Sequence, residues 1–148
     1  MSLDDRDRAI LTALAQDAWL TYGELGARVN LSASAVQRRV ERLRAEGVIT
    51  GAKANIAPEA LGRPLRIFAL VELREESSAA LASLAKRLAK ESCVVETHYL
   101  AGPYDILIAL QMRDMSNYAD FAEKHLNGNS NVRRYKTLTS LRAFTSPA

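Results

Sequence analysis

The sequence is poor in cysteine, and it lacks both a long apolar run and an apolar leader. One of its 148 residues, Cys93, is a cysteine, which excludes an internal disulfide and suits a reducing cytoplasm. No segment approaches the roughly 18 to 20 consecutive apolar residues that span a bilayer. The first seven residues are acidic and have no apolar core, so we expect no signal peptide there.

Net charge is also modest. At +3 it is too small to indicate nucleic-acid binding by itself, and a hydrophobic content of 48% is typical of a globular protein with a real core. The distribution of charge is more informative. Residues 1–27 carry two bases and five acids, a net charge of −3, whereas residues 28–53 carry six bases and two acids, a net charge of +4. Such local asymmetry is typical of an element that reads DNA.

The basic segment has the pattern of one amphipathic helix. Val36, Val40 and Leu43 are spaced i, i+4, i+7, Ser32 suits the N-cap, and Gly47 suits the residue just past the end. Polar and arginine side chains occupy the other faces, as in a helix that enters the major groove, although an ordinary solvated face has the same composition. The predicted DNA contacts are Ser32, Ser34, Gln37, Arg38, Arg39 and Arg42.

Within this set, the pattern separates two roles. Arg38 lies opposite the apolar stripe and is predicted to contact a base edge, whereas Arg42 on the flank is predicted to contact phosphate.

Two further helices precede the basic one. Asp4 can cap the first, with Asp5 and Asp7 favourably placed in its positive N-terminal turn. Thr21 and Glu24 form a capping-box pattern for the second, which should end near Asn30, a residue that tolerates the left-handed conformation. Three helices with a short turn before the basic one predict a helix-turn-helix, and a plain three-helix bundle is the alternative.

The sequence predicts two domains of an α+β protein. A short strand or wing is expected at 48–51, and the prolines and glycine of 57–64 indicate a boundary. We therefore predict a (winged) helix-turn-helix domain at 1–50, a linker at 51–64 and a second domain at 65–148. In that domain we expect strands at 65–73, 94–100, 105–112 and 132–141, a helix at 78–91, and a helix capped by Ser116 that ends at Asn127. The order βαββαβ predicts a ferredoxin-like sheet with both helices on one face.

The strand at 106–110 is apolar at every position. Two helices on one face leave the other face of this strand without cover, so packing against a second copy of the chain is the simplest arrangement. This pattern predicts a homodimer.

Two sets of residues carry a resemblance to a known family. The first is Leu3-Asp4-Asp5, Ile10-Leu11, Leu31-Ser32, Arg38-Arg39-Val40 and Gly47-Val48-Ile49, and the second is Gly102-Pro103-Tyr104-Asp105. In this order and spacing they resemble the leucine-responsive/AsnC (feast/famine) family of prokaryotic transcription regulators, over nearly the whole chain. Departures are Pro103, where the family often has aspartate, Gly26, where alanine is usual, and Trp19.

The resemblance implies a DNA-binding regulator whose ferredoxin-like domain senses an amino acid or similar small effector. It implies dimers that often assemble into tetramers or octamers around double-stranded DNA. We expect no cofactor, and the single cysteine indicates the cytoplasm. By position, the effector-binding residues would be Gly102, Tyr104 and Asp105.

Two other functions stay open. Siroheme decarboxylases resemble the same family, but here His98 has no second histidine or arginine near it through Leu110, and His125 lies on the last helix. The sequence has no metal-ligand cluster, phosphate-binding glycine loop or nucleophile–base pair, so we predict a protein that is not an enzyme. An architectural protein that compacts DNA without an effector is the remaining alternative.

Overall fold

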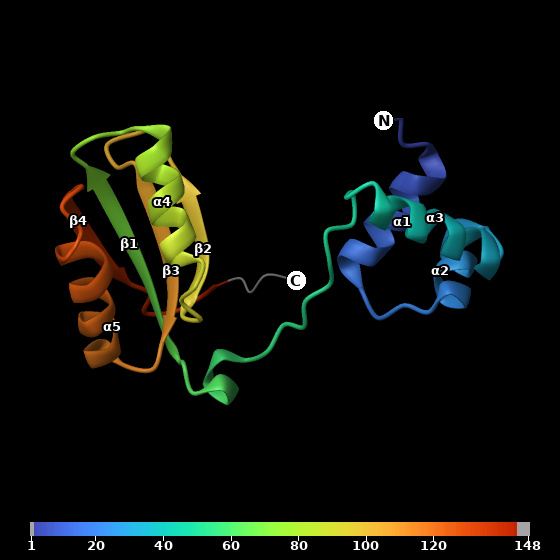
Figure 1. Cartoon of the computed structure of the whole chain (residues 1–148). Helices are drawn as coiled ribbons and strands as arrows, with labels where there is room; N and C mark the ends of the chain where they lie inside the picture. Colours follow the sequence, from blue (N-terminus) through green and yellow to red (C-terminus); the bar gives the residue numbers. More distant parts are fainter. Residues whose placement is uncertain (1, 145–148) are drawn as a thin grey trace. The chain divides into compact units, whose positions relative to one another are not determined.

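The computed structural model describes residues 2–144, which divide into two compact units between Asn55 and Ile56 (Figure 1). Each unit has a hydrophobic core of its own. The division falls within the segment that the sequence marks as a linker, in which residues 51–57 are exposed and have no regular structure. No helix in the described part of the chain has the length and apolar content needed to cross a membrane.

The N-terminal unit consists of three helices, α1 (Asp5–Gln16), α2 (Tyr22–Val29) and α3 (Ala33–Ala45). The predicted caps are confirmed: the side chains of Asp4, Thr21 and Ser32 accept hydrogen bonds from backbone N–H groups of the first turns. Glu24 completes the predicted capping box of α2, and Asp7 completes a second box on α1. These local bonds determine where each helix begins.

The turn between α2 and α3 is tight because of two residues. Asn30 adopts the left-handed conformation, with φ 55°, as expected from its type. A Cβ atom on Gly26 would lie only 2.5 Å from the carbonyl oxygen of Leu31, so the absence of a side chain lets the turn close over α2. The Leu31 N–H donates to the Gly26 carbonyl at 2.9 Å. The turn thereby places Ser32 at the N-cap of α3.

The end of α3 differs from the prediction in one respect. Gly47 has φ 71°, and the N–H of Val48 donates to the Leu43 carbonyl at 2.9 Å, which makes the predicted glycine stop a Schellman motif. The strand predicted at 48–51 is wrong. The Ile49 N–H also donates to the Leu43 carbonyl, at 3.1 Å, so the amides of Val48 and Ile49 bond the end of the helix instead of a neighbouring strand. The side chains of Val48 and Ile49 pack on the three-helix core.

That core contains the apolar stripe of α3 and the inward positions of α1 and α2. Its fully buried members are Ile10, Leu25, Val36 and Leu43. The helix-turn-helix therefore buries the α3 stripe that the spacing predicts and presents the opposite face of α3 outward.

The C-terminal unit has the predicted order of strands and helices. Its elements are a 3₁₀ turn η1 (Pro58–Leu61), β1 (Leu65–Leu73), α4 (Ser78–Leu88), β2 (Val94–Tyr99), β3 (Ile106–Met112), α5 (Met115–Ala122), a π turn η2 (Glu123–Asn127) that continues α5, and β4 (Val132–Thr139). The strands form one antiparallel sheet in the order β2-β3-β1-β4. This confirms the ferredoxin-like α+β fold.

One predicted cap is wrong. Ser116 does not begin the second helix of this unit, because Asp114 accepts a hydrogen bond from the Asn117 N–H at 2.8 Å and occupies the N-cap. The helix consequently begins at Met115.

The sheet has a covered face and an apolar second face. Alternate residues of β1 and β3, among them Ile67 and Ile108, form one core with Leu88 of α4 and Phe121 of α5. The opposite positions of the same strands are apolar at the centre, where these helices do not cover them, and Arg66, Glu72 and Gln111 lie toward the strand ends. In register, Phe68 lies between Ala109 and Leu138, and Leu70 lies beside Leu107. The second face is defined by Phe68, Leu70, Leu107, Ala109 and Leu138.

Candidate functional site

The outward face of α3 is the first candidate site. Ser34, Gln37 and Arg38 are exposed, and Arg38 has no ion-pair partner among residues 2–144. The Gln37 amide donates to Glu41 at 2.9 Å, and the hydroxyl of Ser32, besides capping the helix, lies 3.2 Å from that of Ser34. These side chains can exchange their mutual hydrogen bonds for bonds to base edges or phosphates.

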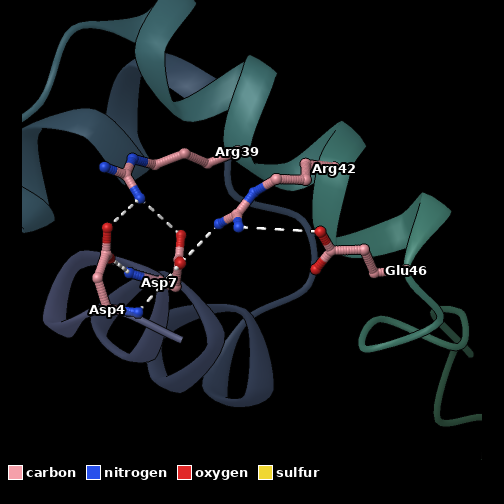
Figure 2. Close-up of polar contacts among 5 residues, drawn as sticks. All are labelled: Asp4, Asp7, Arg39, Arg42 and Glu46. Carbon is pink, nitrogen blue, oxygen red and sulfur yellow. Dashed lines mark hydrogen bonds and ion pairs between the residues drawn. The ribbon is translucent and has the colours of Figure 1, made fainter. Parts of the chain in front are cut away.

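Arg39 and Arg42 lie elsewhere on α3, facing α1. Figure 2 shows both guanidinium groups pointing at Asp7. Arg39 Nη1 donates to Asp7 Oδ1 at 2.8 Å and to Asp4 Oδ2 at 2.7 Å, and Arg42 Nη2 donates to Asp7 Oδ2 at 2.6 Å. The six predicted DNA contacts are thus divided between two faces of the helix. Their contact with DNA stays a prediction.

The sequence did not indicate the burial of Asp7. Its side chain is 1% exposed, while those of Arg39 and Arg42 are 30% and 41% exposed. Burial alone raises the pKa of the Asp7 carboxyl, but hydrogen bonds from Arg42 and Arg39 outweigh it and lower the pKa to about 2. Asp7 therefore stays ionised at neutral pH and forms the centre of a charged cluster between α1 and α3.

The second candidate site is the loop between β2 and β3. Gly102 is exposed, and Tyr104 and Asp105 are half-buried. Asp105 Oδ2 accepts a hydrogen bond from the Leu73 N–H at 2.6 Å, and the Asp105 N–H donates to the Val71 carbonyl at 2.9 Å. These bonds attach the loop to the end of β1, so Asp105 stabilises the loop whether or not a ligand binds.

The two histidines each lie beside a glutamate. His98 Nε2 is 3.1 Å from Glu96 in an exposed position on β2, and buried His125 is 2.9 Å from Glu91. Lys124 also bonds Glu91, at 2.7 Å, and lowers the pKa of that carboxyl. No group of three or more His, Cys, Asp or Glu residues suited to a metal ion occurs among residues 2–144.

A hollow that the sequence did not predict borders His125. Its volume is about 300 Å³, and its walls include Cys93, Met112, Phe121 and Arg63. Burial raises the pKa of the Cys93 thiol. None of the residues of the 101–105 loop lines this hollow.

Both units match models of known domains. Residues 3–50 match a model described as winged helix-turn-helix DNA-binding, and residues 66–147 match the Lrp/AsnC ligand binding domain. A helix-turn-helix with a basic, exposed third helix, followed by a ligand-binding α+β domain, defines the class: a DNA-binding transcription regulator with a sensing domain.

Similar proteins identify the family within this class. The leucine-responsive regulatory protein of Rhizobium meliloti is 34% identical over 142 residues, which cover 96% of this chain and 91% of that protein. The structure of the Mycobacterium tuberculosis leucine response regulatory protein (LrpA) matches with a TM-score of 0.84 at 31% identity, over 99% of this chain and 97% of that one. A Neisseria meningitidis regulator in complex with L-Met gives a TM-score of 0.87 at 28% identity, over 98% and 94%. The chain belongs to the Lrp/AsnC family of transcription regulators.

Proposed function

We propose that this chain binds double-stranded DNA sequence-specifically through α3 and adjusts that binding to a small amino acid held by its C-terminal domain. The roles follow the predicted boundaries: DNA binding at 1–50, a linker at 51–64, and effector binding and oligomerisation at 65–148. The observation that supports this best is the exposed row of Ser34, Gln37 and Arg38 on the face of α3 opposite its buried stripe. Its setting is the cytoplasm.

In this proposal the outward residues of α3 contact the base edges. Arg38 has both edges of its guanidinium available for the bidentate contact that arginine makes with guanine, and Gln37 can pair with adenine. Ser32 and Ser34 at the helix start suit phosphate contacts, where backbone N–H groups also attract anions. The prediction that Arg39 and Arg42 reach phosphates has less support, because both groups already bond Asp7.

Replacement of Arg38 tests this assignment. Arg38→Ala should weaken binding to a duplex enriched from a random pool by about 1–3 kcal/mol and relax the preference at one base position. Arg38→Lys keeps the charge but loses the planar fork, so it should also lose discrimination. Titrations on the enriched and a random duplex measure both effects. Equal losses on the two duplexes would remove Arg38 from the base-reading set, and footprints without sequence preference would favour an architectural protein.

Effector binding is proposed for the loop that contains Gly102, Tyr104 and Asp105. Support comes from the matched ligand-binding domain and from the relative that was solved with L-Met. Among residues 2–144 only one oxygen of Asp105, Oδ2, has a partner, which leaves Oδ1 for an α-ammonium group. Backbone amides beside Gly102 can approach a carboxylate closely, and Tyr104 offers a ring with one polar tip.

Asp105→Asn separates the structural task of this residue from the proposed one. The amide oxygen of asparagine can still accept the Leu73 hydrogen bond, so the fold should be kept while the negative charge is lost. Calorimetry with the proteinogenic amino acids should find a ligand whose affinity falls at least tenfold, or about 1.4 kcal/mol, in this variant. Glu59→Gln, which removes a charge from the exposed turn η1, is the control. The site assignment fails if the ligand binds both variants equally, and the sensing role fails if no amino acid binds wild type.

Dimerisation through the second sheet face is part of the same proposal, with further assembly to tetramers or octamers. Two copies would place two α3 helices on one partly palindromic site, about one helical turn of DNA apart or a multiple of it.

A catalytic role has little support. The named relatives are regulators, and both histidines are paired with glutamates rather than grouped with further ligands or bases.

A further inference from the structure

Carboxylates at the start of α1 bond two arginines of α3, the helix proposed to read DNA (Figure 2). Arg39 and Arg42 are one turn apart on α3, and each donates to a different oxygen of Asp7. Asp4 adds a second acceptor for Arg39, and Glu46 lies 3.9 Å from Arg42. Asp4 and Asp7 also bond each other's backbone N–H groups in the capping box, so both carboxylates are fixed on the first turn of α1.

The charges in this cluster largely compensate one another. Asp7 is almost fully buried, and both of its oxygens accept from guanidinium groups. If Arg39 and Arg42 turned away toward phosphates, they would leave a buried carboxylate without partners, which is strongly unfavourable. The two arginines are therefore bound to the protein even though each is partly exposed. Arg38, the neighbouring residue in the sequence, has no such constraint.

We propose that Asp7 is a positioning residue that limits sequence-independent affinity for DNA: by holding Arg39 and Arg42 against α1, it withholds both cations from DNA phosphates and leaves recognition to the outward face of α3. The inference rests on the proposed DNA binding. Phosphate contacts raise affinity for every sequence alike, so withholding two of them lowers the affinity for all DNA and makes binding less dependent on salt. On this view Arg39 and Arg42 contribute little to the salt dependence of the wild-type protein.

Asp7→Asn in the full-length chain tests the proposal. The amide is similar in size but lacks the buried charge that holds the guanidinium groups. Arg39 then keeps only the exposed carboxylate of Asp4, and Arg42 only its 3.9 Å contact with Glu46, so both can turn toward phosphates. Binding to a random-sequence duplex should tighten by roughly tenfold at low salt, and the slope of log K against log salt concentration should steepen by about one to two. Binding to the enriched duplex should tighten by a similar factor, because the added contacts are independent of sequence. Addition of Arg39→Gln and Arg42→Gln to this variant should reverse the gain.

Asp5→Asn is the matched control. Asp5 lies in the same turn of α1, is exposed, and is not a partner of either arginine, so this change removes one negative charge without releasing a cation. Its salt slope should stay near that of wild type. If Asp7→Asn and Asp5→Asn give equal slopes, the withholding role is wrong. A merely structural defect would weaken binding to all DNA and would not produce the expected gain on random sequence.

Arg39→Gln provides a second route if Asp7→Asn does not fold, as judged by circular dichroism. Arg39 is 30% exposed, and its replacement leaves Asp7 with the hydrogen bond from Arg42. Because the proposal withholds Arg39 from phosphates, the salt slope of this variant should stay near that of wild type. A slope that flattens by about one in a folded Arg39→Gln variant would overturn the proposal. Absence of DNA binding by wild type would instead reject the proposed function, so the two failures are distinct.

Discussion

Replacement of Leu43 by alanine is expected to unfold the N-terminal unit while the sheet domain stays folded. Leu43 is fully buried on α3, in a core shared only with residues of the three-helix unit and its flanking turns. Removal of three buried carbon atoms leaves a cavity and costs about 2–5 kcal/mol, a large part of the stability of a domain of this size. The variant should lose DNA binding, because α3 is no longer held in place.

Hydrogen exchange followed by mass spectrometry measures the effect unit by unit. Amides of α1, α2 and α3 should exchange faster in Leu43→Ala, whereas those of β1 and β3 should keep their wild-type protection. Leu110→Ala, a fully buried change of the same chemistry on β3, is the matched control and should give the reverse pattern. Faster exchange in both units of both variants would show that the two cores are energetically coupled.

A lysine in place of Leu107 is expected to convert the proposed dimer into a folded monomer. Leu107 is half-buried on the second face of the sheet, beside Leu70 of β1 and His98 of β2. In a two-fold dimer each substitution occurs twice, so two ammonium groups would be buried in one apolar interface. The dissociation constant should rise by about a thousandfold or more, corresponding to roughly 4 kcal/mol.

Light scattering at micromolar concentration distinguishes the two states. Ser83→Lys introduces the same charge on an exposed position of α4 and should leave the assembly unchanged. The Leu107→Lys monomer should keep its far-ultraviolet circular dichroism, because this side chain points away from the core under α4 and α5. A dimer that survives the substitution would place the interface on another surface.

Local signals in the sequence predicted most of the fold. Asp4, Thr21 and Ser32 bond amides only three residues away, so their type and position define helix starts without reference to the rest of the molecule. Gly47 and Asn30 similarly define helix ends through their own backbone conformation. The uninterrupted apolar run at 106–110 indicated that both faces of β3 are apolar at the centre of the sheet.

The errors arose where two local options compete or where partners are distant in sequence. Asp114 and Ser116 are both good N-cap types two residues apart, and Asp114 takes the Asn117 N–H. Asp7 looked like a solvent-exposed charge at a positive helix end, but its arginine partners lie 32 and 35 residues away. Since no periodicity links α1 to α3, the sequence placed Arg39 and Arg42 simply on the flanks of the reading helix.

The pairing of the sheet also determines the order in which the molecule can fold during synthesis. β1 lies between β3 and β4, and its Ile67 pairs with Thr139, so the sheet is incomplete until the last strand has left the ribosome. The three helices need only contacts within the first 50 or so residues, and such local topologies fold quickly. We therefore expect the DNA-reading unit to be native while one edge of β1 still has no partner, and a nascent chain to be most vulnerable to aggregation through that edge.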